Sequence, residues 1–249
     1  VDSKHGLTAP ELMEILGGYD ALVVRSETKV TAEIIGAGKK LQVIARAGIG
    51  VDNIDLEAAT SAGIPVVNAP TGNTVAAAEH TLALMLALAR NIPEAHRSVK
   101  GGEWRRSAFM GIEVRNKTLG IIGLGRIGEA IVHRALAFKM KIGYHNRSPK
   151  NLPYTYYPTV TELAVNCDVL LCLLPGGEDT NNVIGADVFQ NLGPEGIFIN
   201  VGRGSSVDEE ALVAALKAGL IAGAGLDVYA HEPAVPEALL SMEQVVLFP

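Results

Sequence analysis

The chain has 249 residues, of which 48% are hydrophobic and 19% are charged, and its formal net charge is −6. This composition is typical of a soluble α/β protein with one large or two modest domains, and the acidic balance argues against a broad nucleic-acid surface. The longest apolar run, residues 81–89, is far shorter than the roughly 20 residues that cross a bilayer, so we expect no membrane span and no signal peptide.

Apolar strand patterns alternate with helical patterns, which predicts parallel βαβ units in a doubly wound sheet. In the first third, strands are expected at residues 21–24, 41–45 and 65–68, with helices at 31–36 and 56–62. Pro70 and Gly72 then interrupt the pattern. We therefore predict two domains, residues 1–70 and residues 71–249.

The second predicted domain begins with a long helix at 75–90 and an extended segment at 101–116. Trp104 and Phe109 lie in that segment, and we interpret them as packing anchors, with a subunit interface as the favoured use. The following elements are expected as strand 118–122, helix 127–138, strand 140–144, helix 159–164, strands 169–174 and 197–201, helix 208–218, and strands 223–228 and 244–248. Cys167 and Cys172 lack the C-x-x-C spacing of metal and redox sites, so we interpret them as buried thiols in a reducing compartment.

Three glycines, Gly123, Gly125 and Gly128, form a G-x-G-x-x-G pattern between a predicted strand and a predicted helix. The first glycine allows a tight turn, the second lets backbone N–H groups approach a pyrophosphate, and the third lets the helix pack on the strand. The pattern alone is weak evidence, but its place at a strand-to-helix turn predicts a dinucleotide-binding site.

The residues after the next strand indicate which dinucleotide binds. An acidic side chain about 20 positions after the glycines usually holds the ribose 2′-hydroxyl. This region has no carboxylate and instead carries Asn146, Arg147 and Ser148. A guanidinium and two short polar groups suit a 2′-phosphate, which favours NADP, with NAD as the alternative. A solvated arginine after a strand is the simpler interpretation of Arg147.

Five motifs, in this order, resemble the D-2-hydroxyacid dehydrogenases, a family that includes phosphoglycerate dehydrogenase and the glyoxylate/hydroxypyruvate reductases. They are Arg46–Asn53, Asn73–Glu79, Gly120–Gly128, Asn200–Gly204 and Gly225–Val228, the last running on to Glu232 and Pro233. The first hundred residues are most similar to phosphoglycerate dehydrogenase, and the part from Tyr144 onward is more similar to NADP-dependent hydroxypyruvate and hydroxyphenylpyruvate reductases. The resemblance implies a Rossmann domain with a smaller, flavodoxin-like α/β substrate domain. We expect that substrate domain to be truncated, without its first strand and its C-terminal return.

The resemblance also implies roles for three side chains of the second domain. Arg203 matches the family's catalytic arginine, which holds the substrate carboxylate and polarises the carbonyl at C2. Glu232 matches the acid that pairs with a catalytic histidine, and Asp227 matches the residue that holds the nicotinamide carboxamide. Without the resemblance, Arg203 would be interpreted as an arginine that anchors a glycine turn, Glu232 as a loop carboxylate and Asp227 as a turn aspartate.

Further candidates complete the predicted site. Gly48, Ile49 and Gly50 match a backbone loop that receives the substrate carboxylate, although both glycines could equally shape a turn. Arg25 and Arg46 match positions near the phosphate of a phosphorylated substrate, with solvated surface arginines as the alternative. The remaining candidate cofactor-binding residues are Thr74, Arg126, Ile127, Pro175, Thr180 and Val201. No metal site is expected.

The family's acid/base histidine follows the strand that ends here at Pro249, so the resemblance implies that this histidine lies beyond the chain, and the chain's 6 histidines are expected to be structural or on the surface. We expect a cytoplasmic, homodimeric, NADP(H)-dependent 2-keto acid reductase; an organelle is the alternative location if a transit peptide was removed. Glyoxylate, hydroxypyruvate, hydroxyphenylpyruvate and phosphohydroxypyruvate all remain candidate substrates. The alternatives are a non-catalytic, dinucleotide-dependent binding protein of the corepressor type and an inactive truncated or engineered family core.

Overall fold

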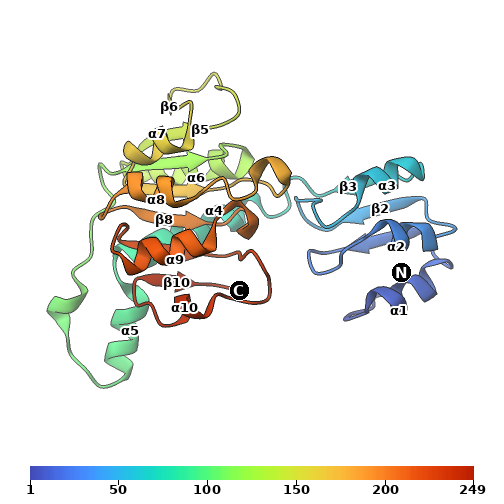
Figure 1. The fold of residues 1–249 in the computed structure, drawn as a ribbon, viewed down its shortest axis with the longest axis horizontal. Helices are drawn as coiled ribbons and strands as arrows, with labels where there is room; N and C mark the ends of the chain where they lie inside the picture. The colour runs from blue at the N-terminus through green and yellow to red at the C-terminus, as the bar shows by residue number, and fades with distance from the viewer. The chain divides into compact units, whose positions relative to one another are not determined.

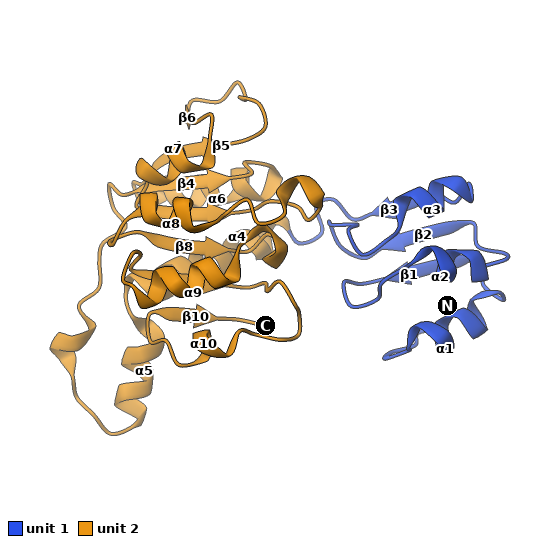
Figure 2. Cartoon of the chain, in the orientation of Figure 1, with its two compact units in different colours: residues 1–73 blue, residues 74–249 orange.

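The computed structural model describes residues 1–249, and the chain forms two compact units. Unit 1 is Val1–Asn73 and unit 2 is Thr74–Pro249 (Figure 2). The sequence pattern predicted a boundary between residues 70 and 71. No helix combines the length and the apolar character needed to span a membrane.

Unit 1 is built on a three-stranded parallel sheet with the strand order β1-β2-β3. The strands are Ala21–Val24, Val43–Arg46 and Val66–Asn68, and the helices are α1 (Ala9–Leu16), α2 (Ala32–Ala37) and α3 (Leu56–Ser61). Aliphatic side chains such as Ile34 and Ile44 form one buried core between the sheet and its helices. Helix α3 begins where the Asp55 carboxylate accepts a hydrogen bond from the Ala58 N–H, which satisfies a free amide of the first turn.

Unit 2 contains a seven-stranded, fully parallel sheet with the order β10-β9-β8-β7-β4-β5-β6. The strands are β4 (Thr118–Ile122), β5 (Lys141–His145), β6 (Thr155–Tyr156), β7 (Val169–Cys172), β8 (Ile197–Asn200), β9 (Gly223–Leu226) and β10 (Val245–Leu247). From β4 the chain builds the sheet first toward β5 and β6, and then returns to add β7 on the other side. The sheet is therefore doubly wound, which confirms the predicted Rossmann class.

Helices cover both faces of this sheet (Figure 1). Helices α4 (Thr74–Ala89) and α6 (Arg126–Ala137) pack together on one face, and α7 (Val160–Val165), α8 (Ala186–Leu192) and α9 (Glu209–Lys217) cover the other. The remaining helical segments are α5 (Ile92–Lys100), α10 (Glu237–Leu240) and the short 3-10 turns η1 (Arg106–Phe109), η2 (Glu178–Thr180) and η3 (Gly204–Ser206).

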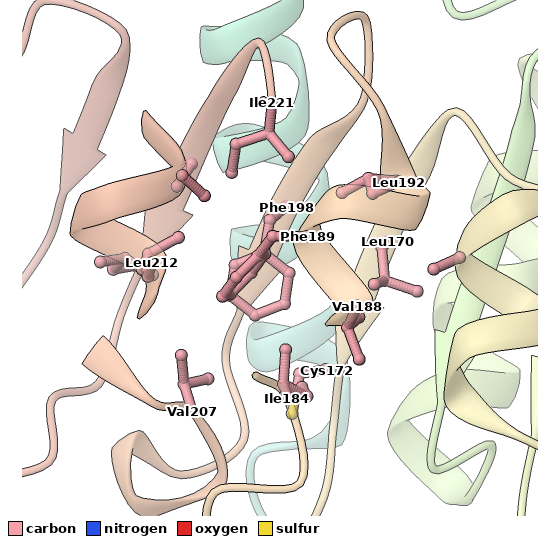
Figure 3. Close-up of a cluster of buried hydrophobic side chains, with 14 of the residues drawn as sticks. Leu170, Cys172, Ile184, Val188, Phe189, Leu192, Phe198, Val207, Leu212 and Ile221 are labelled. Carbon is pink, nitrogen blue, oxygen red and sulfur yellow. The ribbon is translucent and has the colours of Figure 1, made fainter. Parts of the chain in front are cut away.

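The largest apolar core lies between the sheet and helices α7 to α9 (Figure 3). At its centre the rings of Phe189 and Phe198 meet edge to face, with their centroids 5.3 Å apart. Cys172 belongs to the same core, and burial raises the pKa of its thiol to about 12, so the thiol stays protonated. Cys167 is also free, and burial likewise raises its pKa to about 12.

The sequence patterns missed helices α1, α5, α8 and α10 and strand β6. Helix α5 was missed although Ile92, Ala95 and Val99 have helical spacing, because the helix is only 9 residues long and polar on average; Ile92 and Val99 are exposed, and Ser98 is its one buried residue. With the segment that follows, α5 extends away from the body of unit 2 (Figure 1). Trp104, predicted as a packing anchor, is 83% exposed, so it does not pack against the rest of this chain.

Candidate functional site

The parallel strands of unit 2 place most of the predicted site residues at one edge of the sheet. Gly123 follows β4, Asn146 follows β5, Pro175 follows β7, Arg203 follows β8 and Asp227 follows β9. Because all these strands run in the same direction, their carboxyl ends lie together, at the edge where doubly wound sheets bind ligands.

Two of the three glycines, Gly123 and Gly128, have the steric roles that the sequence predicted, and Gly125 leaves open space. Gly123 has φ 90°, and a Cβ there would lie 3.2 Å from the backbone of Leu173. A Cβ at Gly128 would lie 2.9 Å from Leu124 Cδ1, so the glycine lets α6 pack closely on the turn. Gly125 precedes α6, has no atom within 4 Å of an added Cβ, and offers no side-chain cap to the helix. The N-terminus of α6 therefore keeps free N–H groups and open space, which suits a pyrophosphate.

The polar residues after β5 divide between two tasks. The Asn146 side chain accepts a hydrogen bond from Leu124 N at 2.7 Å and donates to Leu124 O at 3.3 Å, so it holds the glycine turn. Arg147 and Ser148 are exposed and make no hydrogen bond or ion pair in the structure. Of the three candidates for a 2′-phosphate, Arg147 and Ser148 have their side chains free to bind it.

The other candidate cofactor-binding residues have varied environments. The Thr74 hydroxyl, at the start of α4, is buried and has no hydrogen-bond partner, so it has an unused donor and acceptor that a ligand could engage. The Thr180 hydroxyl donates to Pro175 O at 2.7 Å and holds the loop after β7. Arg126 is exposed at the first turn of α6, whereas Ile127 and Val201 are half-buried and pack against the core beneath α4 and α6.

Arg203 stands in a turn that the Asn200 side chain fixes. Asn200 is buried at the end of β8; its Nδ2 donates to Arg203 O at 3.0 Å, and its Oδ1 accepts from Gly202 N at 3.1 Å. The Arg203 guanidinium donates to Gly202 O at 2.8 Å and is half-buried. A cation held at this edge can bind and polarise an anionic substrate.

Asp227 lies beside a histidine that the sequence analysis did not select. His80 Nε2 on α4 is 3.0 Å from Asp227 Oδ1, and the two side chains are 25% and 28% exposed. Burial raises the pKa of Asp227, His80 lowers it, and the negative charge of Glu232 raises it; the net effect is upward. Glu232 is exposed, and its Oε1 accepts a hydrogen bond from Tyr229 N at 3.1 Å.

The predicted substrate residues of unit 1 lie after β1 and around the end of β2. Arg25 is exposed. Arg46 is buried, and its guanidinium donates from Nε to Asn53 Oδ1 at 3.2 Å and from Nη1 to Ala47 O at 3.1 Å. Within unit 1, Arg46 therefore supports its own loop.

The glycine loop after β2 is shaped by this arginine. A Cβ at Gly48 would lie 2.5 Å from Arg46 Nη1, so a side chain there would displace the guanidinium. Asn68 Nδ2 donates to Ile49 O at 2.7 Å, and Ile49 and Gly50 are half-buried. The loop is thus held by side chains of its own unit.

Known proteins with similar sequences identify the family to which this arrangement belongs. Residues 82–249 match the family described as D-isomer specific 2-hydroxyacid dehydrogenase, NAD binding domain. The chain belongs to this family. The resemblance that the five motifs carried is therefore confirmed, and unit 2 holds the nicotinamide-dinucleotide-binding domain of a D-2-hydroxyacid dehydrogenase.

Relatives within the family agree in sequence and in fold. The chain is 45% identical to the D-3-phosphoglycerate dehydrogenase of Archaeoglobus fulgidus over 260 residues, covering 100% of this chain and 48% of that protein. The chain thus spans about half the length of the curated relatives it matches. An NADPH-dependent glyoxylate/hydroxypyruvate reductase from Sinorhizobium meliloti, solved with NADP and malonate, has a TM-score of 0.88 at 42% identity, covering 95% of this chain and 74% of that one. A Thermus thermophilus protein has a TM-score of 0.93 at 38% identity, covering 99% and 80%.

Two residues of the candidate site, Asn200 and His80, were not selected from the sequence. Asn200 carried a usable signal, because an asparagine at the end of an apolar strand must find hydrogen bonds once buried. His80 carried none, since it and Asp227 are far apart in the sequence and meet only through packing. Among residues 1–249, no group of three or more His, Cys, Asp or Glu side chains is placed to hold a metal ion.

Proposed function

We propose that the chain is the cofactor- and substrate-binding part of an NADP(H)-dependent D-2-hydroxyacid dehydrogenase that reduces a small 2-keto acid. The observation that carries this proposal is the gathering of the glycine turn, Arg203 and Asp227 at the carboxyl edge of one parallel sheet. The family supports it, since the relatives are named as phosphoglycerate dehydrogenases and as a glyoxylate/hydroxypyruvate reductase.

The preference for NADP rests on the residues after β5. Arg147 is exposed and unpaired, Ser148 is exposed beside it, and no carboxylate stands in this loop to hold a 2′-hydroxyl or to repel a 2′-phosphate. The NADP complex of the Sinorhizobium reductase is consistent with this preference.

The bound nicotinamide supplies the hydride. In this proposal Arg203 binds the substrate carboxylate and polarises the C2 carbonyl, because Asn200 fixes its turn at the carboxyl edge of the sheet and a guanidinium can donate two parallel hydrogen bonds to a carboxylate. Asp227 orients the nicotinamide by accepting its carboxamide N–H. Glu232 has a carboxylate oxygen left to pair with an imidazole, since Oε1 alone is engaged by Tyr229 N.

A second copy of the chain is the proposed partner, and the segment of residues 101–116 is its contact. Trp104 and Met110 are 83% and 82% exposed there, which is an unusual amount of apolar surface for a short segment. A homodimer that buries these two side chains would explain why they are apolar and exposed in the single chain. The two free cysteines fit the proposed cytoplasmic location.

Arg203 provides the test of this function. Replacing Arg203 by alanine is expected to weaken binding of oxamate, an unreactive 2-keto-acid analogue, to the chain in the presence of NADP⁺ by about 10- to 100-fold, the usual worth of a charged hydrogen bond. Arg203→Lys keeps the positive charge but loses the two parallel N–H donors of the guanidinium, so its oxamate affinity is expected to lie between those of the parent chain and Arg203→Ala. Calorimetry measures both.

The matched control is Arg134→Lys, which alters an arginine of the same unit that pairs with Glu79 at 3.0 Å outside the site. It is expected to bind oxamate as the parent chain does. Unchanged oxamate affinity in Arg203→Ala would contradict the assignment of the substrate carboxylate to Arg203.

A further inference from the structure

His80 reaches Asp227 because small residues on β9 let α4 lie close to the sheet. A Cβ at Gly225 would lie 3.0 Å from Leu88 Cδ1 and 3.5 Å from Leu84 Cβ, so a larger residue would push the helix away. His80 is one turn before Leu84 on this helix, and Asp227 is two residues after Gly225. The close packing therefore carries the imidazole to the end of β9.

The imidazole is held from its other side by an aromatic ring. The centroids of His80 and Phe248 are 4.4 Å apart, with the planes tilted by 55°. The backbone of Phe248 is fixed in turn, since its N–H donates to Leu226 O at 2.9 Å and its carbonyl accepts from the Tyr229 hydroxyl at 3.0 Å. The backbone that carries this ring is therefore bonded to β9 and to the loop that follows it.

The His80–Asp227 contact is close but imperfect. The two atoms are 3.0 Å apart, yet the buried Nε2 has no aligned hydrogen bond to Asp227 or to any other group. Asp227 Oδ2 has no hydrogen-bond partner at all, and the side chain keeps 28% of its surface exposed. One carboxylate oxygen is thus engaged by the histidine while the other is available to a ligand.

We propose that His80 is the positioning residue for the nicotinamide half of the dinucleotide: it holds Oδ1 of Asp227 so that Oδ2 accepts the carboxamide N–H. This inference rests on the proposed function, since it assigns Asp227 to the nicotinamide. It adds a residue on α4, far from the glycine turn in sequence, to the residues that set affinity for the reactive end of the cofactor.

The charges around the pair make its effect depend on pH. Glu232, on the loop after β9, raises the pKa of Asp227, and burial raises it further, whereas His80 lowers it. Tyr229, on the same loop, adds no charge at neutral pH, since an ordinary phenol is protonated there and burial raises the pKa of Tyr229 further. Without His80, the pKa of Asp227 rises, and Asp227 loses its charge at a higher pH.

The test compares NADPH with 2′-phospho-ADP-ribose, which lacks the nicotinamide. In His80→Leu, calorimetry is expected to show NADPH binding weakened about 10-fold, as for the loss of one close contact to a charged group, while 2′-phospho-ADP-ribose binds within about twofold of the parent chain. His80→Gln keeps an N–H donor near the place of Nε2 and is expected to restore most of the NADPH affinity. His133→Leu, on the exposed face of α6, is the matched control.

The pH profile gives a second readout. The advantage of NADPH over 2′-phospho-ADP-ribose should disappear as the pH falls through the pKa of Asp227, and in His80→Leu this loss should move to higher pH. Equal weakening of both ligands, unchanged NADPH binding in His80→Leu, or no recovery in His80→Gln would overturn the role of His80. If 2′-phospho-ADP-ribose fails to bind the parent chain, the proposed NADP-dependent function itself is wrong.

Discussion

Replacing Gly125 by aspartate is expected to abolish dinucleotide binding without weakening the fold. An added Cβ at Gly125 meets no atom within 4 Å, and the residue precedes α6 with φ −107° and ψ −155°, a backbone conformation open to any residue. Aspartate at this position caps free N–H groups and complements the helix dipole, so stability should stay equal or rise by about a few tenths of a kcal/mol.

The same carboxylate occupies the place proposed for the pyrophosphate and repels it. We expect the affinity for NADPH to fall by at least about 100-fold, which corresponds to roughly 2.7 kcal/mol. Calorimetry measures binding, and thermal unfolding in the absence of nucleotide measures stability. Gly185→Ser, at the start of α8 and outside the site, should leave NADPH binding unchanged. NADPH binding that survives in Gly125→Asp would place the pyrophosphate elsewhere.

Gly204→Ala is expected to show the largest loss of stability. A Cβ at Gly204 would overlap the backbone of Tyr229 and Ala230, in the loop that carries Glu232. Backbone atoms cannot rotate away as the end of a side chain can, so the turn after β8 and the loop after β9 must separate. The expected cost is about 3 kcal/mol, at the upper end for overpacking, which lowers the melting temperature by roughly 6–12 °C in a domain of this size.

Gly185→Ala is the control for Gly204→Ala, because the nearest atom to its added Cβ is Asp187 Oδ1 at 3.6 Å, an ordinary contact. Its melting temperature should stay within about 2 °C of the parent chain. A melting temperature for Gly204→Ala equal to that of this control would show that the two loops are not packed as described.

Much of the fold followed from local patterns. Strands such as β1, β4 and β8 lie within or match the predicted ranges, because each is a short apolar run bounded by turn residues. Strand β2 was predicted at 41–45 and lies at Val43–Arg46, since an arginine was not expected as the last, buried residue of a strand. Helix α5 and the two-residue strand β6 were missed because both are short, and the apolar residues of α5, Ile92 and Val99, are exposed rather than part of a core.

The site was predictable where one motif supplies both position and chemistry. The glycines of the β4–α6 turn are the clearest case, since Gly123 and Gly128 each have the steric reason that the pattern predicted. The bonding of Asn146 to Leu124 and the contact of His80 with Asp227 depend on segments that are far apart in the sequence. No spacing in the sequence encodes such contacts.

Calorimetric titration of the chain with NADPH and with NADH, repeated on Arg147→Asp, tests the central claim most directly. We expect the parent chain to bind NADPH more tightly than NADH, by about 10-fold or more, because Arg147 forms charge-assisted hydrogen bonds to the 2′-phosphate. In Arg147→Asp we expect the reverse order, because the carboxylate repels that phosphate and accepts from the 2′-hydroxyl. Equal binding of both nucleotides by the parent chain, or an unchanged preference in Arg147→Asp, would contradict the NADP assignment, and failure to bind either nucleotide would contradict the dinucleotide site itself.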